Sequence, residues 1–108
     1  MLKRTYTDDK RTYGTIKAMI EDNKDCQEDE AGCPCYTVDA VMEDGKGYDS
    51  TFYFNDEKCE IELYESYPLV LRGDGFYERD LESPITNTNL LESIYTKSLE
   101  PYQLLFFN

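Results

Sequence analysis

Four cysteines and a dense run of acids are the residues of this chain with the clearest chemical potential. The stretch DNKDCQEDEAGCPC, residues 22–35, holds five carboxylates and three of the four cysteines. Four thiolates are the number of ligands that a tetrahedral zinc site takes. One hypothesis is therefore a zinc-stabilised protein whose ligands are Cys26, Cys33, Cys35 and Cys59.

The spacing of these cysteines does not favour zinc. The pattern is C-x6-C-x-C-x23-C, with one close pair, whereas structural zinc sites usually combine two close pairs. The neighbouring carboxylates attract a cation, but they also raise thiol pKa values and disfavour the thiolate that zinc needs. We therefore expect no metal and no cofactor, with Cys59 and Cys35 as small buried side chains. The zinc-stabilised protein stays as the alternative.

Catalytic signatures are missing from the sequence. The chain has no histidine, so Ser–His and Cys–His nucleophilic systems are excluded. No glycine-rich phosphate-binding motif occurs. Carboxylate pairs could do acid–base chemistry, but among 23 acidic residues many pairs will be neighbours by chance. We predict that the protein is not an enzyme.

The charge is large and unevenly distributed. The 108 residues suit one domain, 1–108, with a formal net charge of −12. Residues 21–66 hold fifteen acidic and three basic side chains, whereas residues 1–20 hold two acidic and five basic ones. A field of this sign repels nucleic acid and anionic membranes, and it favours basic protein partners.

No apolar run approaches the length of a membrane span, and no apolar segment follows the basic start MLKRTYTDDK. We expect a cytoplasmic protein with reduced cysteines.

Period-two alternation is the clearest structural pattern. Residues 35–43, 48–55 and 59–66 each place apolar side chains at every second position, and DGKG (44–47) and NDEK (55–58) separate them with turn residues. This pattern predicts an antiparallel meander over residues 35–66. The side chains expected to point into the core are Tyr36, Val38, Ala40, Met42, Tyr48, Phe52, Phe54, Cys59, Ile61 and Leu63.

The flanking segments are less regular. The N-terminal segment suggests a hairpin around DDK, with Ile16, Ala18 and Ile20 inward, although residues 12–21 also fit a helical face. A second hairpin is predicted over 67–81, turning at 72–75. A helix is predicted near 89–99 from a capping box at Asn89 and Glu92, the stripe Leu91, Ile94, Tyr95 and Leu99, and a stop at Pro101.

The terminal run 104–107 suits a buried strand. The expected fold class is α+β, predominantly antiparallel β-sheet with flanking hairpins and one C-terminal helix.

The outward side of the meander gathers acids and tyrosines, and the loop 22–30 adds more carboxylates. Residues two apart on a strand are separated by about 6.6 Å, a spacing near that of successive phosphates. Tyrosine is enriched at binding hot spots and can stack on arginine. The candidate partner-binding residues are Asp39, Glu43, Asp49, Tyr53, Glu60, Glu62 and Tyr64 on the meander, and Asp22, Asp25, Glu28, Asp29 and Glu30 in the loop.

In size, acidity and lack of catalytic residues, the chain resembles small acidic inhibitors of phages and mobile elements, such as DNA mimics and anti-CRISPR proteins. This resemblance rests on no shared motif and carries over no residues. The leading hypothesis is a non-enzymatic inhibitor that occupies the basic, nucleic-acid-binding surface of a partner protein. A merely solvated acidic face, and a structural or assembly subunit, are the other readings.

Overall fold

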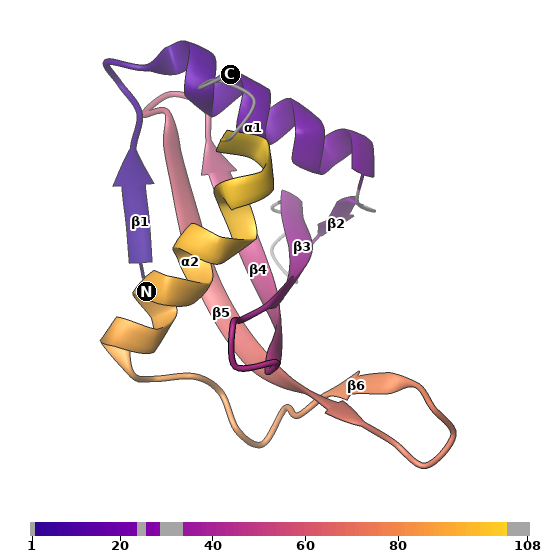
Figure 1. Ribbon diagram of the computed structural model, residues 1–108. Helices are drawn as coiled ribbons and strands as arrows, with labels where there is room; N and C mark the ends of the chain where they lie inside the picture. The colour runs from indigo at the N-terminus through magenta and orange to yellow at the C-terminus, as the bar shows by residue number, and fades with distance from the viewer. Residues whose placement is uncertain (1, 24–25, 29–33, 104–108) are drawn as a thin grey trace.

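A computed structural model describes residues 2–23, 26–28 and 34–103 (Figure 1). The elements in chain order are β1 (Leu2–Thr5), α1 (Lys10–Asn23), β2 (Cys26–Glu28), β3 (Pro34–Val41), β4 (Gly47–Asn55), β5 (Glu60–Leu71), β6 (Tyr77–Arg79) and α2 (Thr88–Gln103). The strands form an antiparallel sheet in the order β1-β5-β4-β3-β2, and β6 pairs with the far end of β5. The predicted α+β class is confirmed.

The predicted meander is β3, β4 and β5, joined by two tight turns. In the first turn Gly45 has a φ of 85°, a value that costs glycine little because it has no Cβ. In the second turn the amide of Lys58 donates to Asn55 Oδ1 at 3.1 Å, and Cys59 adopts a φ of 51°. Local turn chemistry therefore fixes the two reversals that the sequence predicted.

The predicted N-terminal hairpin is wrong, because residues 10–23 form the helix α1, the alternative for residues 12–21. Asp9 caps this helix, accepting a hydrogen bond from the amide of Thr12 at 3.2 Å. Tyr13, Ile16 and Ile20 are buried, whereas Ala18, which the hairpin would have turned inward, is exposed. The helical period explains the burial because these three positions lie on one helical face.

The predicted C-terminal helix is confirmed as α2, although both of its end signals differ. Asn87, not Asn89, caps it, since Asn87 Oδ1 accepts the amide of Leu90 at 2.9 Å. Pro101 lies inside the last turn and the helix continues to Gln103. A proline that close to the end removes one helical hydrogen bond without ending the helix.

The second hairpin is confirmed, with its turn at 72–75. The amide of Arg72 donates to the carbonyl of Phe76 at 2.9 Å, and Gly75 has a φ of 86°. Its first strand is the continuation of the third meander strand, so β5 runs unbroken for 12 residues. The end of β5 and β6 form a hairpin arm, residues 69–79, that extends away from the helices (Figure 1).

A bulge in β5 changes which side chains point to the core. Phe52 lies opposite Leu63, but Thr51 lies opposite Glu65, so Tyr64 is an extra residue in β5. Beyond it Ser66 points inward, and its hydroxyl pairs with that of Ser50 at 3.0 Å. Glu65 is therefore on the opposite side of the sheet from the core.

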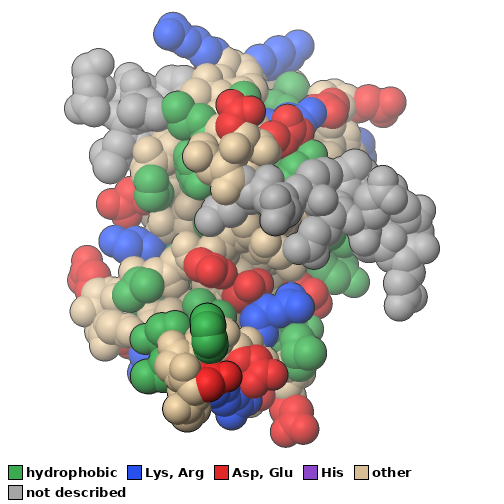
Figure 2. Space-filling view, turned by 90° about the vertical axis from the view of Figure 1, so that its right-hand side faces the viewer, with side chains coloured by type: hydrophobic (Ala, Val, Ile, Leu, Met, Phe, Trp, Pro, Cys, Tyr) green, Lys and Arg blue, Asp and Glu red, His purple; other side chains and the backbone are tan. Residues whose placement is uncertain are grey.

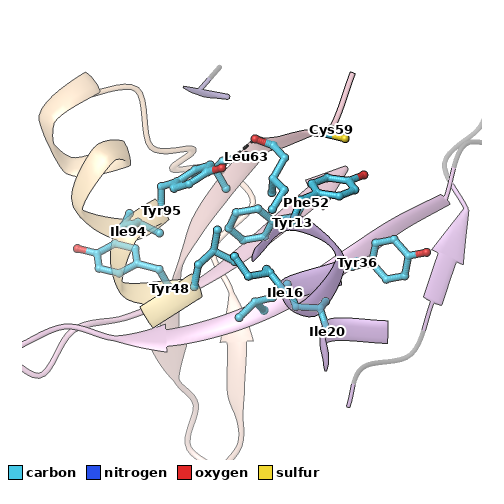
Figure 3. Packing of buried hydrophobic residues seen from close by; sticks show 13 residues of the cluster. Tyr13, Ile16, Ile20, Tyr36, Tyr48, Phe52, Cys59, Leu63, Ile94 and Tyr95 are labelled. Atoms are coloured by element: carbon cyan, nitrogen blue, oxygen red, sulfur yellow. Dashed lines mark hydrogen bonds between the residues drawn. The ribbon is translucent and has the colours of Figure 1, made fainter. Parts of the chain in front are cut away.

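Both helices cover the same face of the sheet. Tyr13 of α1 contacts Phe54 edge-on, with ring centroids 5.9 Å apart, and Tyr95 of α2 contacts Phe52 at 5.7 Å. Phe52 and Phe54 are two residues apart on β4, so their side chains share a face. Figure 3 shows these side chains converging between the sheet and the helices, with the Tyr95 hydroxyl bonded to the Ile61 carbonyl at 2.9 Å.

The predicted inward set of the meander is confirmed: its members are buried, apart from Met42 and Phe54, which are partly buried and pack against the core. The strand suggested for residues 104–107 lies outside the described residues.

Candidate binding interface

The sheet has a second face, and none of the described helices covers it. We call it the open face. Alternation along β1, β3, β4 and β5, together with the bulge, assigns its side chains. From the first to the last of these strands they are Lys3, Thr5, Cys35, Thr37, Asp39, Val41, Asp49, Thr51, Tyr53, Asn55, Glu60, Glu62, Tyr64, Glu65, Tyr67, Leu69 and Leu71.

At the end next to β1, the open face carries two glutamates. Glu60 and Glu62 lie opposite Thr5 and Lys3 of β1. Lys3 Nζ is 3.7 Å from Glu60 Oε2, and the Thr5 hydroxyl donates to Glu60 Oε1 at 3.4 Å. One lysine therefore faces two carboxylates, and a net negative charge remains at this end.

Two tyrosines stand beside these glutamates. Tyr53 of β4 and Tyr64 of β5 meet edge to face, with ring centroids 5.2 Å apart and an interplanar angle of 79°. The bulge places Tyr64 there, and 44% of its surface is exposed. An aromatic pair surrounded by carboxylates can stack on a guanidinium group while the acids neutralise its charge.

Nearer the hairpin arm, three strands bring a second group of acids together. Asp39 of β3 lies directly opposite Asp49 of β4, and Arg79 Nη1 of β6 lies 3.9 Å from Asp49 Oδ1. Burial, followed by the charge of Asp39, raises the pKa of Asp49 to about 6, whereas Arg79 acts to lower it. Carboxylates directly opposite each other repel, so this arrangement favours an added cation or proton.

Glu65 and Tyr67 complete this acidic group. The Tyr67 hydroxyl donates to Glu65 Oε2 at 3.0 Å, and this hydrogen bond raises the pKa of Tyr67. The charge of Glu65 also contributes to the raised pKa of Asp49. Simple alternation along β5 predicts Glu65 inward, so sequence reasoning missed it. A signal was present nonetheless, because the apolar alternation of β5 stops at Leu63 and a serine takes the later inward position.

Some of the predicted partner-binding residues lie together on one face of the sheet. Asp39, Asp49, Tyr53, Glu60, Glu62 and Tyr64 lie on the open face. Glu43 does not, because it is in the β3–β4 turn and lines a hollow beside α2.

The predicted acidic loop 22–30 is not part of the open face as far as the structure describes it. Asp22 is exposed in the last turn of α1, on the helix-covered side. Glu28 belongs to β2, and its side chain lies outside the described part of the chain, as do Asp25, Asp29 and Glu30.

Two of the four cysteines have described side chains, and both are buried as expected. Cys59 belongs to the core cluster, and its thiol lies 3.8 Å from the carbonyl oxygen of Asp56. Cys35 alternates with the inward-pointing Tyr36, so it lies on the other side of β3. These two thiols therefore do not share a face, as a four-cysteine zinc site would require. The side chains of Cys26 and Cys33 lie outside the described part.

No protein-family model, curated protein or solved structure that we compared with this chain matches it. Among the described residues, no helix combines the length and the apolar character needed to cross a lipid bilayer.

Proposed function

We propose that this chain is a non-enzymatic acidic binding protein, an inhibitor that occupies the basic, nucleic-acid-binding surface of a partner protein. Such a protein would act as the DNA mimics and anti-CRISPR proteins of phages and mobile elements do. The observation that carries the proposal is the open face. It bears five carboxylates, on Asp39, Asp49, Glu60, Glu62 and Glu65, together with the tyrosines Tyr53, Tyr64 and Tyr67.

The arrangement of these carboxylates suits a cationic groove. Glu60 and Glu62 are two residues apart on one strand, which separates their backbones by about 6.6 Å. Asp39 and Asp49 lie directly opposite each other on the neighbouring strands β3 and β4, nearer the hairpin arm. The acids thus form a two-dimensional array on the sheet, and in Glu60 and Glu62 a partner that binds phosphates would find negative charges at a spacing near that of successive phosphates.

Electrostatic repulsion among these acids also favours binding of a positively charged partner over exposure to solvent alone. The Asp39–Asp49 pair repels itself, and Arg79 at 3.9 Å relieves that repulsion only in part. A cationic groove would supply further positive charge, and binding would release the counterions of both surfaces. The Tyr53–Tyr64 pair would add contacts that a bulk polyanion lacks.

The test is capture with a charge-reversed variant. Wild-type protein and the double variant Glu60→Lys/Glu62→Lys are immobilised and offered the heparin-binding fraction of a bacterial lysate. We expect the wild type to retain a basic protein that short duplex DNA displaces and that dissociates steeply as salt rises. The double variant should lose that protein while keeping its circular-dichroism spectrum.

The matched control is Glu57→Lys/Glu100→Lys. It changes the net charge by the same amount at exposed positions in the β4–β5 turn and on α2, and it should capture as wild type does. Equal loss from both double variants would mean that only net charge matters. Unchanged capture by the open-face variant would show that the acidic face is merely solvated, and the proposal would fail.

A further inference from the structure

Large apolar side chains stand in solvent on and beside the hairpin arm. The exposed fractions are 58% for Leu71, 73% for Phe76 and 67% for Tyr77, and Val41 at the end of β3 is 62% exposed. Figure 2 shows hydrophobic side chains gathered at the lower end of the molecule, where the arm points toward the viewer, with charged side chains around them. Exposed apolar side chains that gather in one patch often mark an interaction site, whereas apolar side chains exposed singly need no explanation.

Strand register places several of them on the open face. Val41 lies opposite Gly47, Leu69 opposite Arg79, and Leu71 opposite Tyr77. Leu69 lies over Gly47, because a Cβ built on that glycine would be 3.4 Å from Leu69 Cδ1. We call Val41, Leu69, Leu71 and Tyr77 the apolar end of the open face.

The apolar end is continuous with the acidic group. Asp39 and Asp49 form the cross-strand pair next to Val41 and Gly47. Arg79, opposite Leu69, reaches Asp49 at 3.9 Å and links the arm to the acids. One surface therefore runs from the glutamates near β1, across the aspartates, to the apolar side chains of the arm.

Charge selects among the possible occupants of this surface. Among the described side chains, the open face and Arg79 together carry five carboxylates against two cations, Lys3 and Arg79. A second copy bound face to face would oppose like charges, and an anionic bilayer would be repelled. A basic protein meets the acids with opposite charge while it covers the apolar end.

We propose, building on the function proposed above, that the apolar end is a hydrophobic anchor for the same basic partner. In this arrangement the acids occupy the cationic groove, and Leu71 and Tyr77 dock against an apolar patch at the border of that groove. Recognition then has two parts: charge sets the approach and its salt dependence, while the apolar contacts set the rate of dissociation.

The experiment uses the basic protein that wild type captures from the heparin-binding fraction. Its dissociation constant is measured at several salt concentrations for wild type, for Leu71→Ser/Tyr77→Ser and for Glu60→Lys/Glu62→Lys. We expect the arm variant to weaken binding at least about tenfold with an unchanged salt slope. The charge variant should weaken binding and flatten the slope. Leu81→Ser, an exposed leucine (61%) outside the sheet, is the matched control and should bind as wild type does.

Each of the following outcomes would contradict the proposal that the apolar end is a hydrophobic anchor for the basic partner. Wild-type affinity in the arm variant, with the charge variant still defective, removes the anchor and leaves the proposed function standing. Failure of the wild type to capture any DNA-displaceable basic protein removes both. If sedimentation shows that the wild type is a dimer and the arm variant a monomer, the apolar end binds a second copy of the chain. That outcome would favour the assembly subunit. Co-sedimentation of the wild type, but not the arm variant, with neutral phosphatidylcholine vesicles assigns it to a lipid surface.

Discussion

The two faces of the sheet differ sharply in the side chains they carry. On the covered face Phe52 and Ile61 are fully buried beneath the helices. On the open face, the neighbours along the same strands are Thr51 and Tyr53 on β4, and Glu60 and Glu62 on β5. Because strand side chains alternate, one set of strands supplies both surfaces without any extra element. The covered face therefore holds the molecule together, and the open face is free to carry a charge pattern that folding does not require.

This division explains how repulsive acids can be tolerated. Opposed like charges destabilise a sheet by a fraction of a kcal/mol per pair, whereas burying one large apolar side chain contributes roughly 1.5–3 kcal/mol. The aromatic contacts on the covered face outweigh the repulsion on the other. Substitutions on the two faces should thus differ sharply in their effect on stability.

The largest contrast is expected between two phenylalanines. Phe52→Ala removes a ring that is 0% exposed and packed edge-on against Tyr95, so the free energy of unfolding should fall by about 3–5 kcal/mol. Phe76→Ala makes the same chemical change at the tip of the hairpin arm, where 73% of the residue is exposed, and should change stability by less than about 0.5 kcal/mol. Urea denaturation followed by circular dichroism measures both. Similar losses would contradict the assignment of the two faces.

A second contrast tests the hydrogen bond under α2. Tyr95→Phe deletes the hydroxyl that donates to the Ile61 carbonyl at 2.9 Å in a fully buried site, and it should cost about 1–3 kcal/mol. Tyr77→Phe on the exposed arm is the matched control and should be close to neutral. If Tyr95→Phe proves as mild as its control, the buried bond contributes little to the packing of α2.

The meander and its parity could be predicted from sequence because they depend on local signals. Alternation from Tyr36 to Leu63, interrupted by DGKG and NDEK, is enough to define three strands and their inward side chains. The stripe on α2 was equally local. The choice between helix and strand for residues 12–21 was not, since Ile16 and Ile20 fit both periods, and packing of α1 against the sheet and α2 decides it.

The candidate site was predictable only in part for the same reason. The outward positions of Asp39, Asp49, Glu60 and Glu62 follow from alternation. Glu65 does not follow from it, because the bulge at Tyr64 reverses the parity of β5. The contribution of Arg79 depends on how β6 pairs with β5, and no local pattern reveals which carboxylate that guanidinium approaches.

A third prediction concerns pH. The folded-state pKa of Asp49, about 6, exceeds its ordinary value of 3.8. The folded chain therefore holds this proton more tightly than the unfolded chain does. The corresponding stability is fully present below about pH 4, falls as pH rises toward 6, and is absent above. Without solvent screening, this shift in the pKa of Asp49 corresponds to about 3 kcal/mol in the free energy of unfolding. Solvent around this face should reduce that contribution to about 1–2 kcal/mol.

Asp49→Asn should remove that decline. Between pH 4 and pH 7, urea midpoints of the wild type should therefore fall relative to those of the variant. Asp22→Asn, at the exposed end of α1, makes the same exchange away from the pair and should keep the wild-type profile. Parallel profiles for wild type and Asp49→Asn would show that the cross-strand pair does not hold the proton.

The smallest effect on stability is expected at Glu62. Its side chain lies on the open face opposite Lys3, and Lys3 already approaches the neighbouring Glu60 at 3.7 Å. Glu62→Ala therefore removes one carboxylate from a locally acidic group and loses no buried contact. The free energy of unfolding should change by less than about 0.5 kcal/mol, with relief of repulsion offsetting the lost attraction to Lys3. A loss above about 2 kcal/mol in urea denaturation would mean that Glu62 supports the fold. The open face could not then be treated as independent of the covered one.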